Sequence, residues 1–169
     1  MQLALRGAGA AVLGLFLAAC SGSGDYLAVA GGGFVFNYRI AEASYGIAVK
    51  PMRELPPDGI VEASFENPAG GEAFIVSKTG PFNPTRIALA TPPVHGVVKG
   101  RPYKVTLSLR DGAGRELQRI ERSFVSDLDQ SVLPERPLAI GPGYQTNIDR
   151  STTAYPPSLS GPPPAPAAE

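Results

Sequence analysis

The feature that most limits what this chain can fold into is a two-residue alternation of apolar and polar side chains, repeated in short runs. The clearest run is YKVTLSLR, in which every second residue is apolar: Tyr103, Val105, Leu107 and Leu109. Successive side chains of a β-strand point to opposite faces, so this period indicates strands with one buried and one solvated face. Such strands are typical of antiparallel sheets. The chain is therefore predicted to be all-β.

Seven runs of this kind follow one another along the chain: FVFNYRI, YGIAVK, VEASFE, FIVSK, RIALA, YKVTLSLR and LQRIERSFV. Turn-forming segments such as PPDG, NPAGG and TPPVHG separate them. This spacing predicts a single seven-stranded antiparallel sandwich over residues 33–127. In the first run, the alternation places Phe34, Phe36, Tyr38 and Ile40 on one face.

The end of the predicted domain gives two finer expectations. Leu117 and Ile120 can share a buried face only if a bulge intervenes, which predicts a bulged edge strand. The DGAG segment before that strand predicts a hairpin, in which Gly112 and Gly114 adopt positive φ.

The segment VKGRPYKVTLSLRDGAGRELQRIERSF resembles the last two strands of immunoglobulin-like or fibronectin type III-like domains. The resemblance implies that Tyr103 is a tyrosine corner, with its hydroxyl bonded back to the preceding loop. The paired cysteines and core tryptophan of antibody domains are missing, so the resemblance concerns the architecture. A transthyretin-like sandwich is the alternative.

Residues 1–19 are predicted to be a targeting segment, with Arg6 followed by the short apolar run GAGAAVLGLFLAA. Leu17-Ala18-Ala19-Cys20 resembles the lipobox of bacterial lipoproteins. The resemblance implies cleavage before Cys20, a diacylglyceryl thioether on its sulfur, and acylation, typically with palmitate, of the new amino terminus. Two or three acyl chains would anchor the chain stably in a membrane. The alternative is an ordinary secretory signal with Cys20 as a small buried residue.

The segment that follows, residues 20–32, is predicted to be a flexible lipidated tether because it opens with SGSGD. Ser21 stands where enteric bacteria place Asp to retain lipoproteins in the inner membrane. The resemblance therefore favours the outer membrane of a bacterial cell envelope, with the domain facing the periplasm or the cell surface.

Residues 128–169 are predicted to be a proline-rich tail, since residues 134–169 hold nine of the 18 prolines. Its last part, YPPSLSGPPPAPAAE, has too little apolar surface to offset the entropy of ordering. A solvated, disordered spacer is the prediction for this last part. The alternatives are a ligand for a proline-recognising groove and a strand that threads the cell-wall mesh. The segment before this last part carries Leu138, Ile140, Tyr144 and Ile148, which leaves open that it drapes across the sandwich.

No residues combine into a catalytic, cofactor or metal site. His95 is the only histidine, in a Pro- and Gly-flanked loop, and no G-x-S-x-G elbow accompanies it. DLDQS lacks the glycine and distal Glu of a calcium loop. Glu62 and Glu66 lie about 13 Å apart along one strand, too far for a glycosidase pair. The 15 basic and 15 acidic residues cancel, so nucleic acid is not expected as a partner.

The sequence thus predicts a lipid-anchored envelope protein that is not an enzyme. It is expected to bind a protein partner or to act as an accessory in an envelope or surface assembly, through sandwich faces or edge strands. The alternative is a small carbohydrate-binding module for cell-wall or surface polysaccharide, with Tyr26, Tyr144 or Tyr155 stacking on sugars. An open apolar strand edge would favour protein, and a flat row of exposed Tyr or Phe rings would favour sugar.

Overall fold

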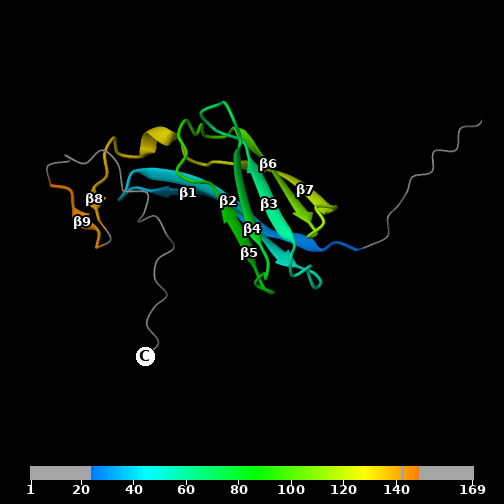
Figure 1. The fold of residues 1–169 in the computed structure, drawn as a ribbon. Helices are drawn as coiled ribbons and strands as arrows, with labels where there is room; N and C mark the ends of the chain where they lie inside the picture. Colours follow the sequence, from blue (N-terminus) through cyan, green and yellow to red (C-terminus); the bar gives the residue numbers. More distant parts are fainter. Residues whose placement is uncertain (1–23, 142, 149–169) are drawn as a thin grey trace, which may run out of the picture.

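The computed structural model describes residues 24–141 and 143–148, in which the two larger antiparallel sheets pack face to face (Figure 1). The three-stranded sheet has the order β1-β2-β5, with β1 at Leu27–Asn37, β2 at Glu42–Pro51 and β5 at Ile87–Ala90. The four-stranded sheet has the order β4-β3-β6-β7, with β3 at Ile60–Phe65, β4 at Phe74–Thr79, β6 at Pro102–Arg110 and β7 at Glu116–Val125. The predicted seven-stranded, immunoglobulin-like sandwich is confirmed.

The core lies between the sheets and is built from the alternating positions of the strands. Every second residue of β2, β3 and β6 is buried, as the alternation predicts: Tyr45, Ile47, Val49, Val61, Ala63, Phe65, Tyr103, Val105, Leu107 and Leu109. Removing this apolar surface from water is the main stabilising contribution, at roughly 25 cal/mol per Å².

The first strand begins earlier than predicted. β1 starts at Leu27, inside the segment assigned to the tether, so the predicted boundary at residue 33 is wrong. The glycine run 31–33 is part of the strand because the fold needs close packing there. A Cβ on Gly32 would lie 2.3 Å from Cζ of Phe124 and 2.5 Å from the carbonyl oxygen of Gly46.

The same strand also ends earlier than predicted. β1 stops at Asn37, and a turn with Ala41 at φ 57° leads into β2. Tyr38 is therefore 46% exposed in the turn, whereas Ile40 is buried. The expectation that Tyr38 shares the buried face of Phe34 and Phe36 is wrong, because the two-residue period holds only within a strand.

The predicted bulge is confirmed in β7. Leu109 pairs with Gln118 and Arg110 with Glu116, so Leu117 is the extra residue, and both Leu117 and Ile120 contact the core. In the hairpin before it, Gly114 has φ 81°, but Gly112 does not adopt a positive φ. Gly112 serves a different purpose, since a Cβ there would lie 1.8 Å from Oδ2 of Asp58.

Part of the predicted tail is structured. Residues 128–148 contain the short 3-10 helix η1 (Gln130–Val132) and the hairpin of β8 (Ala139–Ile140) with β9 (Gln145–Thr146). Leu138 and Ala139 both donate backbone hydrogen bonds to the carbonyl of Arg39. The ordered domain thus extends beyond the predicted boundary at residue 127, and residues 149–169 lie outside the described residues.

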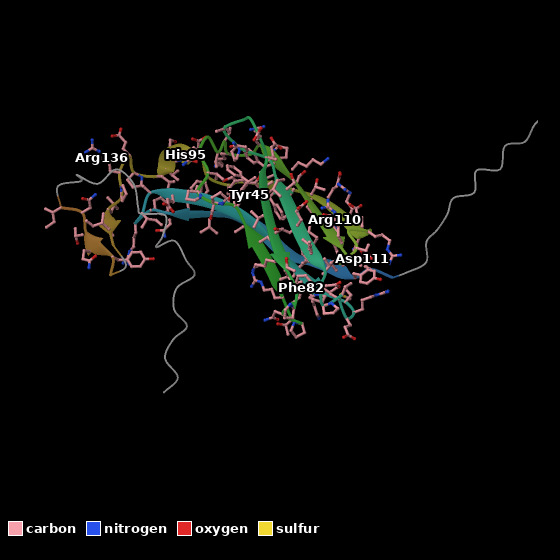
Figure 2. All side chains as sticks on the ribbon, viewed as in Figure 1. Tyr45, Phe82, His95, Arg110, Asp111 and Arg136 are labelled. Atoms are coloured by element: carbon pink, nitrogen blue, oxygen red, sulfur yellow. The ribbon has the colours of Figure 1, made fainter. Side chains whose placement is uncertain are left out.

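The sandwich has two poles. The N-terminal pole comprises residues 24–26 with the loops 52–59, 80–86 and 111–115, and the C-terminal pole comprises the turn 38–41, the loops 66–73 and 91–101, and residues 126–148. Figure 2 shows Phe82 and Asp111 at the first pole and His95 and Arg136 at the second. Among the described residues, no helix is both long and apolar enough to cross a bilayer.

Candidate binding surface

The outward face of the three-stranded sheet is made almost entirely of small side chains. Because Tyr45, Ile47 and Val49 of β2 point into the core, the residues between them point outward, together with their partners on β1 and β5. We call this set the small-residue face; it consists of Gly31, Gly33, Ser44, Gly46, Ala48, Ala88 and Ala90.

The outward face of the four-stranded sheet is different in character. It carries Ser64, Thr106 and Ser123 among charged residues that form ion pairs across the strands. Nζ of Lys104 lies 3.2 Å from Oε2 of Glu121, and a guanidinium nitrogen of Arg110 lies 3.5 Å from Oε1 of Glu62. This face has the polar composition expected of a strand surface in water. The small-residue face does not.

The small-residue face is also hollowed. A shallow depression of about 530 Å³ lies over it, with Val35, Lys50 and Arg86 along its border. A Cβ added at Gly31 or Gly33 would meet no atom within 4 Å, so the backbone there is open to an approaching molecule. Val35 is 63% exposed. The arrangement provides a smooth, largely apolar surface on which another chain can pack.

The two sides of the sandwich differ in how their strand edges are closed. Between β1 and β7, Oε1 of Gln118 accepts hydrogen bonds from the backbone of Tyr26 (2.9 Å) and Leu27 (2.8 Å), and Nε2 donates to the carbonyl of Leu27 (3.0 Å). On the other side, β4 pairs only with β3 among the described strands. Ile75 of β4 is 59% exposed, and Lys78 stands near its end, a residue type that discourages edge pairing.

Tyr103 occupies the position that the resemblance implied. Its hydroxyl accepts a hydrogen bond from the backbone N–H of Val98 at 2.7 Å, and its ring is fully buried. The neighbouring hydroxyl of Tyr45 donates to the carbonyl of Glu66, and burial raises the pKa of Tyr45 well above its usual value. Both hydroxyls tie loops to the core, which is a structural role.

His95 lies exposed in the loop 91–101, with Glu42 of β2 as a neighbour. Partial burial raises the pKa of Glu42, and the charge of His95 acts in the opposite direction. Glu62 and Glu66 hold separate ion pairs with Arg110 and Arg101. The structure thus brings none of these side chains together into a catalytic pair.

Asp129, in the segment compared above with a calcium loop, caps the helix η1. Its Oδ1 accepts hydrogen bonds from the backbone N–H (3.2 Å) and the hydroxyl (3.0 Å) of Ser131, and these bonds lower the pKa of the carboxyl. Within residues 24–141 and 143–148, no cluster of three or more His, Cys, Asp or Glu could hold a metal ion.

The aromatic residues proposed for sugar stacking are scattered. Tyr26 is half-buried at the N-terminal pole, with Cζ of Arg53 4.7 Å from its ring centre. Tyr144 is 47% exposed at the C-terminal pole, where Cζ of Arg39 lies 5.7 Å from its ring centre. Tyr155 and Cys20 lie outside the described residues. No row of aromatic rings lines either sheet in the described part of the chain.

Sequence reasoning missed the small-residue face because it followed only the buried positions of each run. The signal lay at the alternate positions, where Ser44, Gly46 and Ala48 stand in place of the charged residues found in β6. Small outward residues on two neighbouring strands indicate a surface that is not adapted to water alone.

No protein-family model matches this chain, and no curated protein matches it. Among solved structures, it is similar to a Bacteroides uniformis β-glucuronidase, with 14% identity and a TM-score of 0.41 over 59% of this chain and 12% of that one. A calcium-binding mutant of Bacteroides uniformis β-glucuronidase 2 gives 14% identity and a TM-score of 0.40 over 59% of this chain and 13% of that one. The chain thus spans about an eighth of those enzymes.

Proposed function

We propose that this chain is a lipid-anchored, non-catalytic protein of the bacterial cell envelope, and that it binds a protein partner through the small-residue face. The observation that carries the proposal is the contrast between the two outward faces. One bears cross-strand ion pairs, and the other bears glycine, alanine and serine.

Small side chains favour binding for two physical reasons. They let the backbone of a partner approach closely, and they have almost no rotamer freedom to lose on binding. The shallow depression over the face, of about 530 Å³, leaves room for an apposed sheet or strand. Val35 supplies an exposed apolar side chain at the border of this contact.

The decisive experiment is a cross-linking pull-down from intact cells with two charged variants. Ser44→Glu and Ala88→Glu place a carboxylate on the small-residue face, and we expect the recovered partner to be lost. Ser123→Glu, on the outward face of the four-stranded sheet, is the matched control and should recover the partner as the unchanged chain does. Equal recovery from all three variants would show that the small-residue face is not the binding surface.

The anchor is a separate part of the proposal and has its own test. The lipobox supports acylation of Cys20, so metabolic labelling with a fatty acid should mark the chain and Cys20→Ser should abolish the label. A labelled Cys20→Ser chain would contradict the anchor.

Carbohydrate binding is the second candidate, favoured by exposed aromatic rings at the C-terminal pole. Tyr38 and Tyr144 are 46% and 47% exposed there, with Arg39 next to Tyr38 in the chain and beside the ring of Tyr144. If this pole binds polysaccharide, then Tyr38→Ala should reduce co-sedimentation with isolated cell wall, and Ser44→Glu should not.

A further inference from the structure

A second apolar surface lies at the N-terminal pole, next to the end of the small-residue face that Lys50 and Arg86 line. The loops 52–59 and 80–86 enclose a groove of about 490 Å³, lined by prolines from both loops together with Met52, Leu55 and Phe82. Arg53, Glu54 and Asn83 complete the lining. Met52 is 58% exposed at its edge. Prolines carry no backbone N–H, so the five prolines of this lining add no backbone donor that must stay hydrated.

The described chain begins against the wall of this groove. A Cβ on Gly24 would lie 3.0 Å from a guanidinium nitrogen of Arg53, whose Cζ is 4.7 Å from the ring centre of Tyr26. The backbone N–H of Met52 donates to the carbonyl of Tyr26 at 2.8 Å. The point at which the chain enters the domain is therefore fixed beside Met52 and Arg53.

The short segment between Cys20 and Gly24 limits how far the groove can lie from an anchor at Cys20. Four residue steps separate Cys20 from Gly24, and they span at most about 14 Å when fully extended. If Cys20 carries acyl chains in the bilayer, as the proposed function requires, the N-terminal pole cannot move far from the headgroups.

We propose that the groove at the N-terminal pole rests on the lipid bilayer, with Met52 inserted among the headgroups. This inference rests on the lipid anchor of the proposed function. Tyr26 and Arg53 suit the interface, since a tyrosine ring is stable at headgroup depth and a guanidinium pairs with phosphate. Glu54 in the lining of the groove and Asp25 next to Tyr26 in the chain oppose a purely electrostatic attraction, so the contact is expected with zwitterionic lipid.

The absence of tryptophan from the sequence allows a direct test. Met52→Trp places one tryptophan at the groove, and Leu128→Trp places one at the C-terminal pole, where Leu128 is 38% exposed. Each chain, comprising residues 20–169 and hence every described residue, is coupled through its sole thiol at Cys20 to maleimide-bearing phosphatidylcholine vesicles with brominated acyl chains.

We expect the emission of the tryptophan at position 52 to shift to shorter wavelength and to fall by about half on coupling, and that at position 128 to stay unchanged. The same Met52→Trp chain mixed uncoupled with the vesicles is the control for tethering. Equal quenching at both positions, or none at either, would overturn the inference. Circular dichroism of each variant verifies that it is folded.

This test separates the inference from the proposed anchor. Chemical coupling places Cys20 at the bilayer whether or not cells acylate it. Quenching at position 52 supports the lipid contact, and a failed fatty-acid label would then remove the anchor alone. No quenching at position 52 overturns the contact even where the label is found.

Discussion

One tyrosine hydroxyl holds the loop before β6 against the core. In Tyr103→Phe, the backbone N–H of Val98 loses its acceptor at 2.7 Å while the ring keeps its packing. Leaving such a donor unpaired costs about 1–3 kcal/mol, and we expect the free energy of unfolding to fall by that amount. Urea denaturation measures it. Tyr38→Phe, in an exposed turn, should change it by less than about 0.5 kcal/mol, and equal losses would refute the structural role of Tyr103.

At the same scale, Glu42 should make stability depend on pH. Its pKa is raised mainly by burial, so the folded state binds the proton more tightly than the unfolded state does. The stability that protonation provides is therefore present at low pH and is lost as pH rises through the raised pKa. We expect Glu42→Gln to raise the melting temperature at pH 7 and to leave it unchanged near the acid limit of folding. A constant difference across pH would contradict this assignment.

At the scale of the element, the side chain of Gln118 stands in for strand pairing between β1 and β7. It makes three hydrogen bonds with the backbone of residues 26 and 27, which are otherwise at an unpaired sheet edge. Gln118→Ala should lower the free energy of unfolding by about 1–3 kcal/mol and increase hydrogen exchange at Leu27. Ser123→Ala on the same strand is the control. Unchanged exchange at Leu27 would show that the edge does not depend on Gln118.

The strands differ in how far the sequence could predict them. The interior of β6 was predictable because every apolar residue faces the same core, and the bulge at Leu117 followed from a break in that period. The start of β1 was not, since its glycine run reads locally as a linker. Its backbone pairs with β2, and the glycine at position 32 is required by the ring of Phe124, about ninety positions later. No local pattern encodes such a contact.

The candidate surfaces show the same limit. The small residues of β2 and β5 are visible in the sequence, but they form one face only because β2 pairs with both β1 and β5. The groove at the N-terminal pole likewise combines loops 52–59 and 80–86, which the topology of two different sheets brings together. Local pattern predicts the strands, and the pairing of distant strands creates the surfaces.

At the scale of the whole molecule, the chain enters at one pole, and residues 126–148 cover the other (Figure 1). An anchor at Cys20 would therefore hold the C-terminal pole on the side away from the membrane, with the small-residue face between the two poles. This arrangement requires that residues 128–148 pack stably against the rest of the domain. Gln130 donates to the carbonyl of Val97 at 2.9 Å, Leu133 packs on the core, and Asn147 is buried.

Two truncations test that arrangement. A chain that ends at Ile148 keeps all of these contacts, so we expect its urea midpoint to equal that of the full chain. In the full chain, the carbonyl of Arg39 accepts hydrogen bonds from Leu138 and Ala139. A chain that ends at Asp127 loses these bonds and exposes Val97, so its urea midpoint should fall clearly. If both truncations leave the midpoint unchanged, residues 128–148 contribute nothing to the stability of the fold.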